Sequence, residues 1–293
     1  MEALPAKQSG RYNPLNDFLF LKTMGEKGDE EQLLGFLNAV LDKSGKNRIA
    51  SVEIIENRIL TPEVLGDKLS ILDVLAVLQD GSRINIEVQL RNDHNMEKRS
   101  LFYWSREFVN SLKEGQDYKE LRRVIAINII NFELFNSEDF HTCYHLKEDN
   151  DGAFLTDALE IHFVDMEKWR NLSYKDIQGN PLHRWLVWLD PKSPLELVEE
   201  VIKMDTAIQK AQERQDYVLS YEDAQRIYNI RQKARWDYIS ATNYAREEGR
   251  KEGLEDGLKE GKEAVARKAL AEGLSLEFVQ KITGLDIETL EKL

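Results

Sequence analysis

The sequence has little of what several classes of protein require. A single cysteine, Cys143, excludes an intramolecular disulfide and fits a reducing compartment. No apolar run reaches the roughly 18 residues that a membrane-spanning helix needs, and the first residues lack the apolar segment of a secretory signal peptide. We therefore expect a soluble cytoplasmic protein with no membrane partner.

Side chains that bind zinc are also scarce, because the 293 residues include five histidines and the one cysteine. They gather only in "HTCYH" at 141–145, which by itself supplies too few ligands for a zinc site. We do not expect a metal site there.

An excess of positive charge is absent as well. The formal net charge is −13, which argues against a protein that coats nucleic acid without specificity. The acidic residues are spread over both halves of the chain, so any contact with nucleic acid must come from a local basic patch. Part of the acid is available for a metal site.

Apolar patterning predicts an α/β core with a mixed sheet. The expected order is helices in 16–41, a strand in 46–60, a hairpin at 71–90, a helix at 95–115, and strands in 123–134 and 158–169. The run "RVIAINIINFEL" at 123–134 is nearly all apolar, as in a strand covered on both faces. We place the core in residues 1–170, a connecting helical segment in 171–204 and a helical C-terminal region in 205–293.

The C-terminal region carries glycines at intervals of four, at Gly249, Gly253, Gly257 and Gly261. Each glycine costs a helix interior nearly 1 kcal/mol relative to alanine, so the pattern needs a reason. Close approach of two helices is one explanation, and a frayed, charged linker is the other. The last residues, 265–293, predict short helices that resemble a helix-turn-helix in outline.

Two carboxylates interrupt the most strand-like segment, "ILDVLAVLQDGSRINIEVQL" at 71–90. Alternation places Glu87 and Gln89 on one face of the second strand. A two-residue turn would leave Asp73 diagonal to Glu87. A three-residue loop ending with Gly81 in the left-handed conformation would place the two acids opposite each other.

Two carboxylates about 5 Å apart repel unless a cation or proton lies between them. Asp73, Glu87 and the Gln89 amide offer oxygen ligands, which suit Mg²⁺ or Mn²⁺. The alternative is that both acids lie on a solvated face of an edge hairpin. Apolar residues fill both faces of "ILDVLAVL", and this favours metal binding.

An acid on one strand followed by Glu-x-Gln on the next resembles the PD-(D/E)XK nuclease motif. The segments "YNPLNDFLFLKTMG", "INIEVQL", "SLFYWSREFV" and "GQDYKELRRVIAINIINF", with the Glu/Gly/Lys-rich tail, resemble the Rpn family of recombination-promoting nucleases, often labelled transposases. The resemblance implies a restriction-endonuclease-like core, a mixed central sheet flanked by helices, and an all-helical C-terminal region.

This resemblance implies a metal-dependent DNA endonuclease. Asp73 and Glu87 would be the metal ligands, with the Val88 carbonyl as a third, and Gln89 would occupy the catalytic-lysine position. An amide cannot supply the positive charge of a lysine. Either the metal compensates, or the charge comes from one of three cations: Lys22, Lys98 or Arg99.

Two helices carry further candidates. Asp17 matches an acid that faces the site in this group of nucleases, although a helix N-cap would also explain it; Lys22 lies about 140° around the same helix. In the helix at 95–115, we expect an apolar stripe of Leu101, Ser105, Phe108 and Leu112. Arg99, Tyr103 and Arg106 would then form a DNA-contacting edge on the opposite face. The alternative is a solvated face.

The leading hypothesis is a DNA endonuclease that promotes recombination or acts in a mobile-element or defence context. The alternative is a catalytically weak or inactive nuclease fold that binds DNA or a partner as a regulator, and a third is an RNA nuclease. Cutting both strands with one site per chain requires two chains, so we expect a homodimer through the helical C-terminal region.

Overall fold

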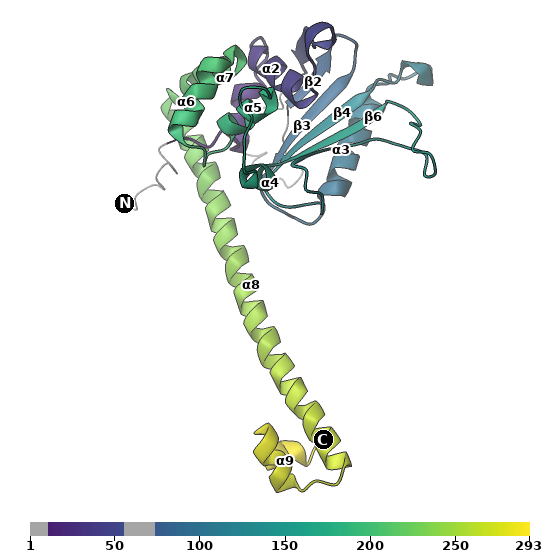
Figure 1. The fold of residues 1–293 in the computed structure, drawn as a ribbon, viewed down its shortest axis with the longest axis vertical. Coiled ribbons are helices and arrows are strands. Elements are labelled where there is room, and N and C mark those ends of the chain that lie inside the picture. Colours follow the sequence, from purple (N-terminus) through teal and green to yellow (C-terminus); the bar gives the residue numbers. More distant parts are fainter. Residues whose placement is uncertain (1–10, 56–73) are drawn as a thin grey trace. The chain divides into compact units, whose positions relative to one another are not determined.

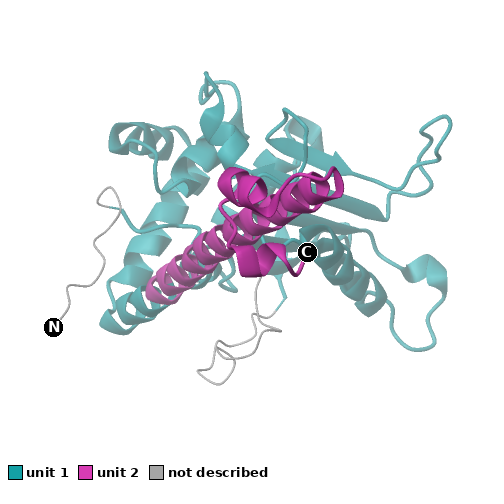
Figure 2. Ribbon diagram, turned by 90° about the horizontal axis from the view of Figure 1, so that it is seen from below, with its two compact units in different colours: residues 1–231 teal, residues 232–293 magenta. Residues whose placement is uncertain are grey.

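The computed structural model describes residues 11–55 and 74–293, which divide into two compact units (Figure 1). Unit 1 comprises residues 1–231 and unit 2 residues 232–293 (Figure 2). Each unit is described by itself. Within the described residues no helix is both long and apolar enough to cross a membrane.

Unit 1 is built around a mixed sheet, as expected for this α/β sequence. Its six described strands lie in the order β1-β2-β3-β4-β6-β5, and Figure 1 shows β3, β4 and β6 side by side. The strands are β1 Val52–Ile54, β2 Val74–Leu78, β3 Arg83–Gln89, β4 Val124–Ile130, β5 His141–Tyr144 and β6 Leu159–Asp165. β3, β4 and β6 are parallel, whereas β1, β2 and β5 pair antiparallel with their neighbours. The edge strand β5 was not predicted.

Helices account for most of the remaining described chain. They are α1 Asp17–Met24, α2 Glu31–Val40, α3 Met96–Asn110, α4 Met166–Asn171, α5 Pro181–Leu189, α6 Leu195–Met204, α7 Thr206–Leu219, α8 Glu222–Ala271, α9 Leu276–Thr283 and α10 Ile287–Leu290, with short 3-10 turns at Gly45–Asn47 and Tyr118–Glu120. Local chemistry sets several starts. The Asn16 side chain caps α1 by accepting from the Leu19 amide at 3.2 Å, and Pro181 occupies the first turn of α5, where its missing N–H costs nothing.

β4 lies at the centre of the core, and all seven of its residues are buried. Ile127 and Ile129 face the larger apolar cluster, to which α1, α2, α5, α6 and α7 contribute. Ala126 and Ile130 face a smaller cluster, in which α3 contributes Met96. The strand is therefore covered on both faces, as its uninterrupted apolar run predicts, and each buried isoleucine contributes about 1.5–3 kcal/mol.

The compact core extends past residue 170, where the apolar pattern had placed its end. Trp185 of α5 and Ile208 of α7 are fully buried in the same cluster as the sheet. α2 and α7 approach so closely that a Cβ on Gly35 would lie 2.2 Å from the Cβ of Ala207. The helices α4 to α7, which follow the last strand, therefore belong to unit 1.

Unit 2 contains a small apolar cluster of its own. Ala266 near the end of α8 packs with Val279 of α9 and Leu290 of α10. Gly284 ends α9 in the left-handed conformation (φ 70°), a position that favours glycine. The short helices predicted for 265–293 are thus present.

Candidate active site on strand β3

The β2–β3 hairpin has the register that the three-residue loop requires. Val74 pairs with Ile86 and Val77 with Arg83. The Leu78 amide donates to the Ser82 carbonyl at 2.9 Å, and Gly81 adopts a φ of 84°. Of the two turns considered above, the chain uses the one ending with Gly81 in the left-handed conformation. Asp73 itself lies outside the described residues.

Glu87 is buried in the middle of unit 1, with only 1% of its surface exposed. It projects from β3 toward α3, where its Oε1 forms an ion pair with the Arg99 guanidinium. Its other oxygen, Oε2, has no hydrogen-bond partner among the described residues. Burial raises the pKa of Glu87 above its ordinary value, and attraction to Arg99 opposes that rise.

Gln89 lies two residues further along β3 on the same face. Its side-chain amide donates to the Arg91 carbonyl at 3.0 Å and to Asp93 Oδ2 at 3.2 Å. Asp93 also forms an ion pair with the Arg91 guanidinium. Val88, between Glu87 and Gln89, pairs with Ile129 in the parallel ladder. The Gln89 amide is therefore held by an acid from the loop that follows β3.

The two arginines of α3 lie against one aromatic ring. The Arg99 and Arg106 guanidinium carbons lie 5.3 and 4.9 Å from the centre of the Tyr103 ring. The Arg106 side chain is 45% exposed, and its Nε is 3.6 Å from Glu107 Oε1. The structure thus brings the three predicted nucleic-acid contacts together, and one of them, Arg99, reaches Glu87.

The expected apolar stripe on α3 was wrong. Leu101 is 49% exposed, and Ser105 is exposed as well. The buried positions on this helix are Met96, Ser100 and Glu107. Ser100 bonds to Asn128 of β4 and Glu107 to Arg83 of β3, so polar pairs hold α3 on the sheet and override the apolar spacing.

Asp17 and Lys22 of α1 have partners elsewhere. Asp17 Oδ2 lies 3.1 Å from the Arg231 guanidinium of α8, and Lys22 Nζ lies 3.4 Å from Glu26. The N-cap of this helix is Asn16, so capping does not explain Asp17. No hydrogen bond or ion pair recorded for the described residues joins either side chain to Glu87.

The described part of the site fits a divalent cation at one point. A buried carboxylate oxygen without a protein partner, Glu87 Oε2, is the kind of ligand that Mg²⁺ or Mn²⁺ prefers. Glu87 carries one negative charge, which Arg99 already balances, so a cation would have to share that charge with Arg99. A second acid is needed for a well-bound metal, and among the described residues Glu87 belongs to no group of three or more metal-ligand side chains.

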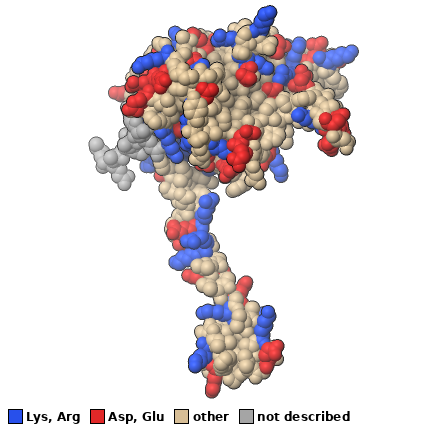
Figure 3. All heavy atoms as spheres, in the orientation of Figure 1, with Lys and Arg blue, Asp and Glu red and all other residues tan. Residues whose placement is uncertain are grey.

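Charges on the surface are mixed. Figure 3 shows basic and acidic side chains interspersed over the face of unit 1 that it draws. This distribution agrees with the acidic composition and leaves a local group such as Arg99, Tyr103 and Arg106 as the positive surface nearest Glu87.

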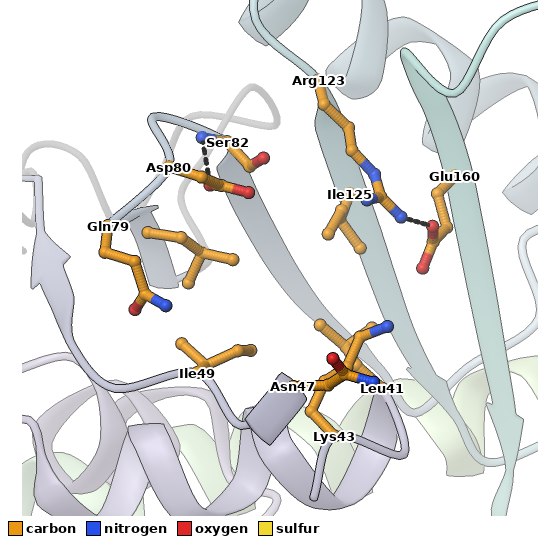
Figure 4. Close-up of a pocket in the computed structure, with 11 residues that line it drawn as sticks. Leu41, Lys43, Asn47, Ile49, Gln79, Asp80, Ser82, Arg123, Ile125 and Glu160 are labelled. Carbon is orange, nitrogen blue, oxygen red and sulfur yellow. Dashed lines mark hydrogen bonds and ion pairs between the residues drawn. The ribbon is translucent and has the colours of Figure 1, made fainter. Parts of the chain in front are cut away.

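A second group of ligand-type side chains lies at the other end of the sheet. Cys143, Glu160 and His162 bring a sulfur, an oxygen and a nitrogen within 4.8 Å of one another. Glu160 also lines a cavity of about 270 Å³ and forms an ion pair with Arg123 there (Figure 4). The sequence analysis missed Glu160 and His162, because only the pairing of β5 with β6 brings them beside "HTCYH".

Comparison with family models assigns the chain to a family. Residues 14–245 match the model of the PD-(D/E)XK nuclease family transposases, and the chain belongs to this family. The match covers the site on β3 and confirms the superfamily and the transposase label that the motif suggested. Comparison with curated proteins and with solved structures found no similar chain.

Family membership supports a nuclease-like hydrolase activity on nucleic acid. PD-(D/E)XK nucleases typically use divalent metals, and the buried Glu87 carboxylate on β3 is consistent with metal binding.

Proposed function

We propose that the protein is a metal-dependent endonuclease that hydrolyses phosphodiester bonds in DNA and promotes recombination, as expected of an Rpn-type nuclease. The observation that carries the proposal is the buried Glu87, whose Oε2 lacks a partner among the described residues. A buried carboxylate oxygen without a hydrogen-bond partner is costly, and a bound cation would offset that cost. Family membership supplies the reaction class.

Asp73 is the proposed second acid. The described register pairs position 74 with Ile86, and continuing it by one residue would set Asp73 against Glu87. These two carboxylates, with the Val88 carbonyl, would hold Mg²⁺ or Mn²⁺. The bound metal would polarise the phosphate and lower the pKa of a water molecule.

Positive charge beside the phosphate is the part that Gln89 cannot supply. Among the three cations considered for this role, Arg99 is the one that contacts Glu87. Lys22 pairs with Glu26, and Lys98 is exposed on α3. We assign the charge to Arg99: when a metal takes over the neutralisation of Glu87, the guanidinium becomes available to a phosphate oxygen, which it can bind bidentately. Gln89 would orient the attacking water through its amide.

The α3 edge is proposed to guide DNA to the site. Arg106 is half exposed and lies against the Tyr103 ring, which Arg99 also contacts. Guanidinium groups position a phosphate backbone, and a tyrosine ring can pack on a sugar or base. Asp17 and Lys22 remain proposed members of the site, although their recorded partners are Arg231 on α8 and Glu26 just after α1.

Self-association is proposed to complete the nuclease. Each chain carries one Glu87 site, and two sites must meet for both strands to be cut. In unit 2, three large apolar side chains are exposed on the charged helix α8: Leu254, Leu258 and Val265. Exposed apolar side chains that lie close together can mark a protein–protein contact. We propose a homodimer through this C-terminal region, acting on DNA in the cytoplasm.

The decisive experiment is an incubation of the full chain with supercoiled plasmid in Mg²⁺, in Mn²⁺ and in a chelator. Asp73→Ala, Glu87→Gln and the exposed control Lys98→Met are assayed beside it. Cleavage that needs the metal, survives in Lys98→Met and is lost in the two acid variants supports the proposal. Wild-type cleavage by Glu87→Gln, or in chelator, would sink it.

The second candidate is a nuclease fold that binds DNA or a partner without cutting. Two contacts favour it: Gln89 is tied to Asp93 instead of being a lysine, and Arg99 already neutralises Glu87. This candidate predicts DNA binding that is independent of metal and unaffected by Glu87→Gln. A binding assay with labelled duplex, single-stranded DNA and RNA in chelator separates it from the nuclease and shows which nucleic acid is preferred.

A further inference from the structure

Four metal-ligand side chains converge on the β5–β6 edge of the sheet. The Cys143 sulfur lies 3.6 Å from His162 Nε2 and 4.0 Å from His145 Nε2. Glu160 Oε1 lies 2.7 Å from His162 Nε2, and its Oε2 lies 3.4 Å from His145 Nε2. All four come from β5, from β6 or from the residue that follows β5.

The spacing suits a small tetrahedral ion. Zinc binds thiolate at about 2.3 Å and imidazole nitrogen at about 2.0–2.1 Å, so neighbouring donors around it lie roughly 3.3–3.7 Å apart. Two of the four separations above are 3.4 and 3.6 Å, and the third, between Cys143 and His145, is 4.0 Å. The fourth, between His162 and Glu160, is a hydrogen bond at 2.7 Å, which opens when an ion replaces its proton. Cys143, Glu160 and His162 already place one donor atom each within 4.8 Å of one another, and the His145 ring would move to become the fourth ligand.

Burial and outer contacts resemble those of a built metal site. Glu160 and His162 are 7% and 5% exposed, while Cys143 is exposed and gives an ion access. His162 Nδ1 lies 2.9 Å from His141 Nε2, so a metal-bound His162 could donate its remaining N–H to a fixed acceptor. Metal-bound histidines almost always have such a partner, which fixes the ring. Arg123 forms an ion pair with Glu160 Oε2, the oxygen that faces His145, and so fixes the carboxylate in place.

We propose that Cys143, His145, Glu160 and His162 form a structural zinc site, separate from the nuclease site. Sulfur and nitrogen donors select zinc over magnesium, and four protein ligands leave no open position for catalysis. The register sets Glu160 beside Ile125, whereas Glu87 lies beside Asn128, so the two sites lie on opposite faces of the sheet.

The proposed role is to fasten the sheet edge. β5 is a four-residue edge strand, and the residues after it return to β6 through a long loop closed by an isolated bridge between Lys147 and Phe154. Short edge strands expose unpaired backbone groups and fray readily. An ion bound by Cys143 and His145 on one side and by Glu160 and His162 on the other would join the two strands, and its binding free energy would add to the stability of the fold.

A cobalt titration of the full chain, followed by visible and near-ultraviolet absorption, tests the proposal. Tetrahedral Co²⁺ with a thiolate ligand gives intense visible bands and a sulfur-to-metal charge-transfer band. Because the chain has one cysteine, that band can come only from Cys143. We expect the charge-transfer band to saturate at one thiolate-bound Co²⁺ per chain, this ion to be displaced by Zn²⁺ and not by Mg²⁺, and the melting temperature to rise with Zn²⁺.

Variants separate the proposed donors from adventitious binding. Cys143→Ser should lose the charge-transfer band and the thermal shift, and His141→Ala should weaken zinc binding about 10–100-fold by removing the outer contact. His94→Asn, which changes an exposed histidine elsewhere, should keep the wild-type charge-transfer band and thermal shift. Absence of the band in the wild-type titration would overturn the proposal, as would wild-type affinity in a folded His162→Gln variant.

Discussion

The Arg99 guanidinium forms an ion pair with the buried carboxylate of Glu87, and this contact joins α3 to the candidate active site. The Arg99 side chain is 26% exposed, whereas that of Glu87 is 2% exposed, so the arginine is the partner that can move toward solvent or substrate. A cation arriving at Glu87 would weaken the pair by competing for the same carboxylate. Metal binding at Glu87 would therefore release the Arg99 side chain from its ion pair.

Replacing Glu87 by glutamine should abolish metal-dependent cleavage without destabilising the metal-free protein. Because burial raises the pKa of Glu87, its ionised form costs stability at neutral pH, and a neutral isostere removes that cost. We expect the free energy of unfolding in chelator to be unchanged or higher, measured by urea denaturation. A clear loss of stability would mean that the ion pair with Arg99 outweighs the burial of the charge.

Arg99 should contribute mainly to the rate of cleavage. Arg99→Met should lower the single-turnover rate by about 10²–10³-fold, because it removes a positive charge beside the developing phosphate charge. Arg99→Lys should recover part of that loss, and Lys98→Met on the exposed side of α3 should leave the rate unchanged. Equal weakening of DNA binding and rate in Arg99→Met would instead identify a simple binding contact.

Gln89→Lys should retain or raise cleavage if this position corresponds to the catalytic lysine. A lysine there could still donate to Asp93, which accepts from the Gln89 amide, and it would add a charge near the phosphate. Gln89→Leu is the matched control that loses both donors. Complete loss of activity in a folded Gln89→Lys protein would show that the amide makes a hydrogen bond that an ammonium cannot replace.

The sheet could be predicted from the sequence because its signals are local. The apolar run 124–130, the Asp80-Gly81 turn and the alternation around Glu87 each act over a few residues. The loop length was left open, since both turns suit an Asp-Gly pair. The observed register, with Val74 opposite Ile86, resolves it.

Two features depended on contacts between distant residues and could not be predicted this way. On α3, two polar residues are buried because each hydrogen-bonds to the sheet: Ser100 to Asn128, and Glu107 to Arg83. The helical spacing of apolar residues does not indicate such pairs. The short strand β5 has exposed and half-buried positions only, so it lacks an apolar pattern. Its neighbours Glu160 and His162 therefore went unnoticed as metal ligands.

His183 should make unit 1 less stable at mildly acidic pH. It is buried in α5, its Nδ1 accepts from the Asp176 amide at 2.9 Å, and burial lowers its pKa. Below its ordinary pKa of 6.5 the unfolded chain therefore binds more protons than the native one, so this stability is complete above 6.5 and declines as the pH falls. His183→Gln keeps an acceptor and should flatten the decline, measured by urea denaturation between about pH 7.5 and pH 5.5. Parallel curves for the two proteins would contradict this.

The C-terminal region should be needed for self-association and not for folding of the nuclease. Unit 1 ends at Arg231, and every strand of the sheet precedes residue 166. A chain truncated after residue 245 should therefore remain folded. It should be monomeric by light scattering at micromolar concentration, and it should nick plasmid more often than it cuts both strands.

Substitutions at the helix glycines distinguish the two explanations of their spacing. Within the described structure, a Cβ at Gly253 or Gly257 would meet no atom within 4 Å, so alanine fits both positions in the single chain. If these glycines allow close approach of two chains, Gly253→Leu with Gly257→Leu should dissociate the dimer, while Leu254→Ser with Leu258→Ser should weaken it through lost apolar contact. If the segment is a charged linker, the Gly253→Leu, Gly257→Leu double variant should keep the oligomeric state of the wild type. Its helix content should rise, because leucine favours a helix over glycine by close to 1 kcal/mol per position. Light scattering and circular dichroism of the full chain and the two double variants distinguish close helix approach from a charged linker. A full-length protein that is monomeric at micromolar concentration would exclude the dimer.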